Sequence, residues 1–189
     1  MDDDLVNMVV SGKRPIVVVD VEATCWKKGV FSRKKETIEI GAVRLLPDRA
    51  HSEWPELQTF VRPLRLPRLS TFCRELTGIS QADVDAAPSF PEALQRFLQW
   101  SPPLDRVVFA SWSPYDAWQL DLDLEAHGLP RLAVPFLDVK KLAAQIIGGK
   151  SLEETASELA PESVALPRHR AINDARRTAQ ILYRLLHPA

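Results

Sequence analysis

The fold of this chain starts from one stretch, Ile16-Val-Val-Val-Asp-Val-Glu-Ala-Thr24. Its first four residues are β-branched and apolar, which is typical of a strand buried in a sheet. Asp20 and Glu22 follow at once, although unpaired carboxylates are costly beside a buried strand. Because side chains alternate along a strand, both carboxylates project from the same face, where each raises the pKa of the other. A divalent metal ion between them is the simplest explanation.

Two further motifs carry the remaining candidate groups. Asp116 ends the segment Ser111-Trp-Ser-Pro-Tyr-Asp116, and the second motif is His169-Arg-Ala-Ile-Asn-Asp174. Each group has an ordinary explanation when taken alone. Asp116 suits the first turn of a helix and Asp174 suits a helix N-cap, while His169 could be a surface histidine among arginines. The ordered set of motifs is more specific than any one of them.

In order and spacing, the three motifs resemble those of the DEDDh family of 3′–5′ exonucleases, which belongs to the RNase H-like superfamily. That family has D-x-E-x-T at the end of its first strand, an Asp opening a later helix, and H-x-x-x-x-D closing the site. This chain matches each motif. The related tyrosine class would have Tyr four residues before the last Asp, where this chain has Arg170. The resemblance extends from about Ile16 to Leu186.

The resemblance implies hydrolysis of phosphodiester bonds with two divalent metal ions. Carboxylates are hard oxygen ligands, which favour Mg²⁺ or Mn²⁺ over Zn²⁺. Two such ions, about 3.5 to 4 Å apart, activate a water and stabilise the departing oxygen. Asp20 is the candidate to bridge both ions, Glu22 and Asp174 complete the side of the attacking water, and Asp116 helps to position the metals. His169 would take the proton of that water, because its ordinary pKa of about 6.5 suits a base near neutrality.

The resemblance also implies how a 3′ end is held. Backbone groups of Glu22 and Ala23, together with the hydroxyl of Thr24, would contact the terminal sugar. The last base would be sandwiched by apolar and aromatic side chains, which stack on any base without reading sequence. The candidates for this role are Phe72, Leu76 and Tyr115. Packing in the core is the alternative for each of them.

The expected partner is single-stranded nucleic acid with a free 3′ end, and the expected products are 5′-mononucleotides. The stretch Phe72-Cys-Arg-Glu-Leu-Thr-Gly-Ile79, with Ala23-Thr-Cys25, resembles the branch that trims histone mRNA and small RNAs, which favours RNA over DNA. Two alternatives stay open. One is a DNA proofreading or repair exonuclease of the same fold, which a 2′-OH contact would separate from an RNA enzyme. The other is a nucleic-acid-binding module without catalysis, which the presence of all five catalytic positions disfavours.

The composition fits one domain. With 189 residues and 46% hydrophobic content, the chain can bury one core. We expect an N-terminal extension over residues 1–14 and a single exonuclease domain over residues 15–189. The formal charge of −1 gives no overall nucleic-acid signature, but basic residues cluster beside the motifs. The clusters are the four arginines of residues 61–74, then Lys27, Lys28, Arg33, Lys34 and Lys35, and finally Arg168, Arg170, Arg176 and Arg177. A solvated surface is the alternative for each cluster.

Three features favour a reducing cytoplasm. Cys25 and Cys73 are too few for a disulfide framework and are expected to be free. The acidic start of the chain is unlike a signal peptide. No apolar run approaches the ~18 to 20 residues that a membrane span needs.

Periodicity predicts the remaining elements. Alternating residues predict strands at 37–46 and 57–61, which form an antiparallel meander with the first strand. A short helix should run from Thr71 to Leu76 and end at Gly78. Helices and strands then alternate: helices from Ser89, over 114–127, over 140–147, from Ser151 and through 175–186, with strands at 106–111 and 136–139. This pattern predicts an α/β fold, and the resemblance implies an RNase H-like mixed five-stranded sheet of order 3-2-1-4-5, flanked by helices.

Overall fold

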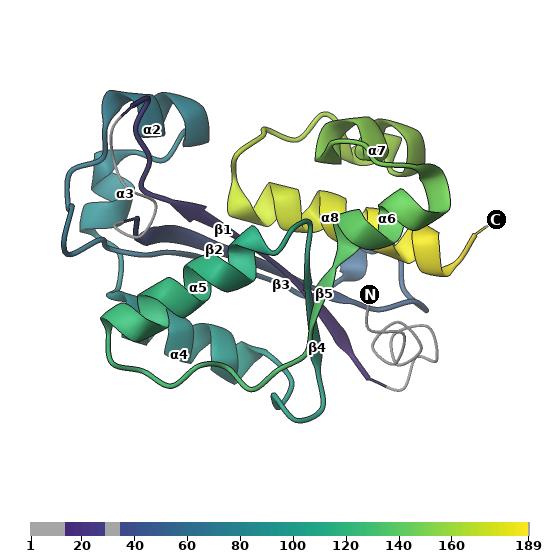
Figure 1. The fold of residues 1–189 in the computed structure, drawn as a ribbon, viewed down its shortest axis with the longest axis horizontal. Helices are drawn as coiled ribbons and strands as arrows, with labels where there is room; N and C mark the ends of the chain where they lie inside the picture. The colour runs from purple at the N-terminus through teal and green to yellow at the C-terminus, as the bar shows by residue number, and fades with distance from the viewer. Residues whose placement is uncertain (1–13, 29–34, 189) are drawn as a thin grey trace.

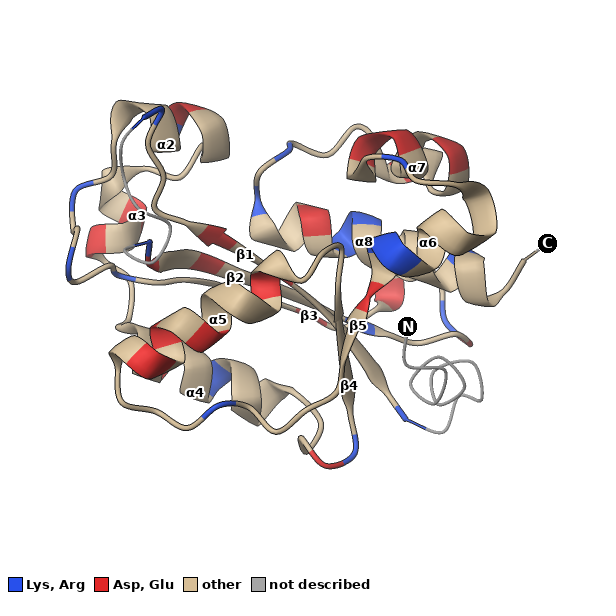
Figure 2. Cartoon of the chain, viewed as in Figure 1, with Lys and Arg blue, Asp and Glu red and all other residues tan. Residues whose placement is uncertain are grey.

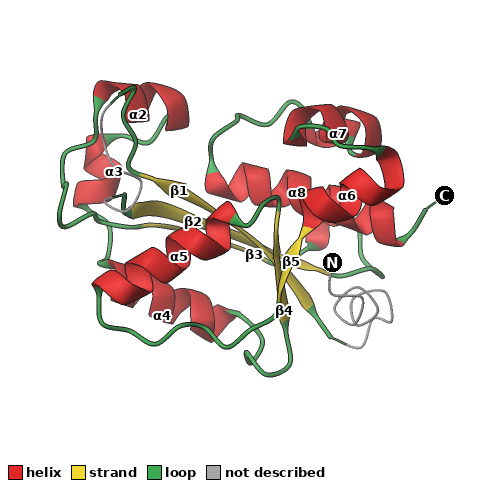
Figure 3. Ribbon diagram, viewed as in Figure 1, coloured by secondary structure: helices red, strands yellow, loops and turns green. Residues whose placement is uncertain are grey.

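The computed structural model describes residues 14–28 and 35–188, and it contains the predicted mixed sheet (Figures 1 and 3). The strand order is β3-β2-β1-β4-β5, as the resemblance implied. β1 pairs antiparallel with β2, which pairs antiparallel with β3, whereas β1–β4 and β4–β5 are parallel pairs. The strands are β1 Ile16–Ala23, β2 Thr37–Leu45, β3 Glu56–Phe60, β4 Val108–Ser111 and β5 Phe136–Asp138.

The helices lie close to their predicted places. They are α2 Thr71–Thr77, α3 Gln81–Asp85, α4 Phe90–Trp100, α5 Tyr115–Ala126, α6 Val139–Ile147, α7 Leu152–Leu159 and α8 Ala171–Leu186, with short 3₁₀ turns η2 His51–Glu53 and η3 Pro161–Ser163. The predicted capping box at Ser151 is present, and α2 ends at Gly78 in the left-handed conformation with φ 68°. The sequence prediction missed α3 and both 3₁₀ turns, which are too short to show a clear period.

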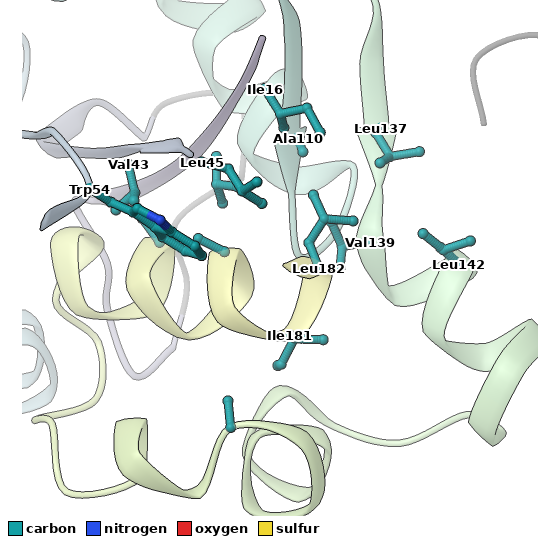
Figure 4. Close-up of a cluster of buried hydrophobic side chains, with 14 of the residues drawn as sticks. Ile16, Val43, Leu45, Trp54, Ala110, Leu137, Val139, Leu142, Ile181 and Leu182 are labelled. Carbon is teal, nitrogen blue, oxygen red and sulfur yellow. The ribbon is translucent and has the colours of Figure 1, made fainter. Parts of the chain in front are cut away.

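The two faces of the sheet are covered by different helices. Along β1, Val17 and Val19 pack with the buried residues of α4 and α5, whereas Ile16 and Val18 join the cluster that includes α6, α7 and α8 (Figure 4). Because side chains alternate, Asp20 continues the face of Ile16 and Val18. The first acidic motif therefore points to the side of the sheet on which α8 lies.

The first turn of α8 rests directly on Gly41 of β2. A Cβ built on Gly41 would lie 2.2 Å from the carbonyl carbon of Ala171 and from the nitrogen of Ile172. Gly41 is also the register partner of Asp20 across the β1–β2 pair. Glycine at this position allows the helix backbone to approach the sheet beside the first acidic motif.

A third, smaller core holds α2 and α3 against the far end of β2. Its buried members are Ile38, Leu69, Cys73, Ile79 and Val84. Ser70 caps α2 by accepting a hydrogen bond from the Cys73 amide at 3.0 Å, and its hydroxyl donates to the carbonyl oxygen of Cys25 at 2.6 Å. This packing fixes α2 beside the residues that follow β1.

Two expectations from the sequence concern the cysteines and membrane-spanning helices. Cys25 and Cys73 are both free thiols, as predicted. Among residues 14–28 and 35–188, no helix combines the length and the apolar character needed to cross a bilayer.

Candidate active site

The end of β1 is where three of the predicted motifs meet. β1 pairs with β4 only from Ile16 to Val18, so the last residues of β1 pair with β2 alone. The amide of Val21 instead donates a hydrogen bond to Oδ1 of Asp116 at 3.1 Å. The first turn of α5 thereby places Asp116 beside Asp20, although 96 positions separate them (116 − 20). The prediction that Asp116 lies in the first turn of a helix is confirmed.

The last motif closes the site from α8. His169 lies in the loop before the helix, and its amide donates to Oδ2 of Asp174 at 3.0 Å. One ligand atom each of Glu22, His169 and Asp174 lies within 4.8 Å of the others. Figure 2 shows the acidic positions at the ends of β1 and β2, at the start of α5 and near the start of α8. Asp174 is not the N-cap of α8, because that position is Arg170.

The electrostatics of these carboxylates favour the binding of a cation. Burial raises the pKa of Asp20 well above its ordinary value, and the charges of Asp116, Asp174 and Glu22 raise it further. Burial, followed by the charge of Asp174, raises the pKa of Glu22 to about 8. The pKa of Asp116 is raised to about 7 by burial, although hydrogen bonds from Val21 and Ser111 oppose the shift. A cluster of mutually repelling carboxylate oxygens fits a hard divalent cation, which would remove the repulsion.

Arg177 is a buried partner of Asp174 that the sequence prediction placed in a surface cluster. Its side chain is 2% exposed, forms an ion pair with Oδ1 of Asp174, and donates to the carbonyl oxygen of Leu166. Burial raises the pKa of Asp174, and the charge of Arg177 opposes that rise. Arg177 therefore orients Asp174 and holds the loop before His169. The i+3 spacing from Asp174 was the available signal.

Glu39 is a second buried group that sequence analysis did not select. It lies on β2 directly opposite Glu22 in the strand register and is fully buried. Its charge contributes to the raised pKa of both Asp20 and Glu22. In sequence it is one acid within an alternating strand, which gives no sign of burial.

The candidates for base stacking lie outside the core. Leu76 is 36% exposed, Tyr115 is 38% exposed and Phe72 is half-buried. Phe72 and Leu76 share α2, while Tyr115 begins α5. The ammonium of Lys35 lies 5.6 Å from the centre of the Tyr115 ring. These positions leave apolar surface available, which core packing would not.

The residues assigned to the sugar are more enclosed. Ala23 and Thr24 are buried, and Oγ1 of Thr24 accepts a hydrogen bond from the amide of Glu36 at 3.0 Å. The amide of Thr24 donates to the carbonyl oxygen of Glu36 at 2.9 Å. Thr24 therefore ties the end of β1 to the start of β2, and its contact with a sugar stays a prediction.

Several arginines of the basic clusters form ion pairs within the fold. Arg170 pairs with Glu39, and Arg176 forms two hydrogen bonds with Glu56. In the segment 61–74, Arg65 lies 3.5 Å from Glu36 and 3.7 Å from Asp123. Arg168 lies at 3.9 Å from Glu153. Near the last motif, Arg170, Arg176 and Arg177 are thus engaged with acids of the chain, whereas Arg168 stays 63% exposed. Arg33 and Lys34 lie outside the described residues.

Comparison with known proteins gives consistent matches. Residues 17–182 match the family model described as Exonuclease. The protein named ERI1 exoribonuclease 2 of Homo sapiens is 36% identical over 99 residues, which cover 51% of this chain and 14% of that protein. The 3'-5' exonuclease eri1 of Schizosaccharomyces pombe is 42% identical over 82 residues, which cover 43% of this chain and 27% of that protein. The matches thus span less than a third of the length of these relatives.

The fold also has a similar solved structure. The nuclease domain of 3'hExo, a DEDDh family member bound to rAMP, has a TM-score of 0.82 with this chain at 26% identity. The likeness covers 93% of both chains.

Proposed function

This chain belongs to the exonuclease family, and from that membership we propose that it is a metal-dependent 3′–5′ exonuclease that acts on single-stranded RNA. One observation carries the proposal. Glu22, Asp174 and His169 meet within 4.8 Å, beside Asp20 and Asp116, in the order that the DEDDh pattern requires. Such a constellation of acids and one exposed histidine suits hydrolysis of a phosphodiester.

The carboxylates would hold two divalent ions, Mg²⁺ or Mn²⁺. The charges of Asp116, Asp174 and Glu22 all raise the pKa of Asp20, so Asp20 lies near each of them. It is therefore the candidate to contact both ions, with Glu22, Asp116 and Asp174 around it. When bound, such ions lower the pKa of a water and neutralise charge on the leaving oxygen. Arg177 pairs with Oδ1 of Asp174, whereas Oδ2, the proposed ligand oxygen, accepts the hydrogen bond from the His169 amide.

His169 is the proposed general base. It is exposed, whereas Asp174 is 8% exposed, so its ring can reach a water at the surface of the site. The hydrogen bond that the His169 backbone amide donates to Asp174 holds the backbone of His169 and leaves the imidazole free to take a proton. Proton transfer by a positioned histidine contributes about 10² to 10⁴ in rate.

The proposed substrate is RNA with a free 3′ end. The named exoribonuclease relatives support this choice, as does the resemblance of residues 72–79 to RNA-trimming enzymes. Phe72, Leu76 and Tyr115 offer apolar surface on α2 and α5 for the last base. The two free cysteines support the further proposal that the protein works in the reducing cytoplasm.

The test uses oligonucleotides of one sequence, as RNA and as DNA, labelled at the 5′ or the 3′ end and incubated with Mg²⁺ or Mn²⁺. A 5′-labelled strand should shorten one residue at a time and release 5′-mononucleotides, with RNA cut faster than DNA. A circular single strand should survive. The Asp20→Asn protein, purified in the same way, controls for contaminating nucleases. Rapid cutting of circles would indicate an endonuclease, and faster cutting of DNA would favour the DNA-repair alternative.

A further inference from the structure

The buried carboxylate of Glu39 is engaged with the start of α8. Oε2 accepts hydrogen bonds from Nε of Arg170 at 3.2 Å and from the amide of Ala171 at 3.0 Å. Oε1 accepts from Nη2 of Arg170 at 3.3 Å and from the amide group of Gln58 at 2.6 Å. The carboxylate is thus satisfied on all sides, as a buried charge must be.

These contacts make Glu39 the cap of a helix that belongs to another part of the chain. Ala171 is the first residue of α8, and its N-cap Arg170 provides no side-chain cap. The first amides of a helix have no partner within it, and negative charge is favourable at that end. Glu39 supplies both an acceptor and the charge from β2. It therefore fixes where α8 begins.

The start of α8 is joined directly to the proposed base. His169 directly precedes Arg170. In the described part of the chain, it is the one non-glycine residue with a positive φ, which is 54°. That conformation is unfavourable for a residue with a side chain and persists only when its surroundings hold it. Arg170 is held by Glu39 and lies over the Phe60 ring at 5.4 Å from its centre. The guanidinium of Arg170 is therefore held by two contacts, one with Glu39 and one with the Phe60 ring.

We propose that Glu39 is a positioning residue for His169. By holding Arg170 and the amide of Ala171, it keeps the imidazole beside Glu22 and Asp174 without itself touching substrate or metal. The effect on turnover rests on the proposed nuclease function, whereas the effect on the His169 ring does not. Asp174 has further support from Arg177 and from the packing of α8 on Gly41, whereas His169 directly precedes the residue that Glu39 holds.

The test compares variants of two strand glutamates, Glu39 on β2 and Glu56 on β3, that both contact α8. Glu39→Gln keeps the size of the side chain but loses its charge. The matched control is Glu56→Gln, which weakens the Arg176–Glu56 pair between β3 and the outer side of α8. Glu39→Gln should lower kcat on 5′-labelled RNA on the order of 10- to 100-fold, the loss expected from a misplacement of about 1 Å, with KM little changed. Glu56→Gln should keep kcat. An unchanged or raised kcat in Glu39→Gln would overturn the proposal.

A double-mutant cycle separates positioning from general damage. In a His169→Ala background, Glu39→Gln should cost within about 3-fold, because the group that it positions is already gone. An equal loss in both backgrounds would show that Glu39 acts independently of His169. Where Glu39→Gln does not fold, Arg170→Lys takes its place, because it keeps the charge and loses the two-point contact. It should lower kcat in the same direction.

A readout without turnover keeps the two proposals apart. The chain has four histidines, so the ring resonance of His169 can be assigned by its loss in His169→Ala. That resonance should shift and broaden in Glu39→Gln and stay in place in Glu56→Gln. A displaced resonance in a protein that cuts no oligonucleotide would refute the nuclease function and leave the positioning role standing. An active enzyme with an unmoved resonance would refute the positioning role alone.

Discussion

Gly41→Ala should damage the site by displacing backbone, although Gly41 is not itself a candidate metal ligand or substrate contact. The added Cβ would lie 2.2 Å from backbone atoms of Ala171 and Ile172, and ordinary contact begins at 3.4 Å. Backbone cannot rotate away as a flexible side chain can, so the first turn of α8 must move by about 1 Å (3.4 − 2.2). Overpacking of this kind costs about 1–3 kcal/mol, and a misplacement of about 1 Å can cost 10²-fold in rate. We therefore expect both a lower free energy of unfolding and a kcat reduced on the order of 10²-fold.

The assay pairs urea unfolding, followed by circular dichroism, with hydrolysis of 5′-labelled RNA. Gly149→Ala is the matched control, because its added Cβ meets nothing within 4 Å and its φ is not positive. That variant should keep both stability and kcat. If Gly41→Ala also keeps both stability and kcat, α8 does not rest on β2 as described. The position of His169 then does not depend on the contact between α8 and the sheet.

Three further predictions address the acids and the base. Asp20→Asn should abolish cleavage while RNA binding, measured by fluorescence anisotropy, stays largely intact, because a bridging charge is lost and the shape is kept. His169→Ala should lower kcat by ~10² to 10⁴ with little change in metal affinity, and activity should partly recover at high pH, where hydroxide replaces the base; full activity near neutrality would refute the assignment. The pKa of Glu22 in the folded protein is raised to about 8, above its ordinary value of 4.5. In EDTA, the contribution of Glu22 to the free energy of unfolding should therefore fall as the pH rises from about 4.5 to about 8. Glu22→Gln should flatten that dependence in urea titrations, and Mg²⁺ should stabilise the wild type most at the alkaline end.

Much of the site could be predicted from sequence because its signals are local. The β-branched run before Asp20 predicts a buried strand, and the two-residue spacing to Glu22 predicts a shared face. Asp116 lies in the first turn of a helix, as Pro114 before it indicated. Asp174 lies in the first turn of α8 and not at the N-cap that the sequence suggested. The strand order came from the resemblance, since periodicity alone does not say which strands are neighbours.

The remaining features depend on contacts between distant segments. Glu39 reads as one member of an alternating strand, and its burial follows only from the arrival of Arg170, 131 positions later. Arg176 looks like part of a basic surface, yet folding brings Glu56 to it from 120 positions earlier in the chain. α3 spans five residues, which is too short for a helical period to be visible.

The route of the chain through the site has a consequence for protein synthesis. Asp20 and Asp174 are 154 positions apart (174 − 20), so at about 5–20 residues per second roughly 8 to 30 s separate their emergence from the ribosome. During that interval the growing chain presents only part of the acidic cluster and lacks the histidine. For the proposed nuclease function, this order means that the metal and base groups come together only when α8 has docked on β2.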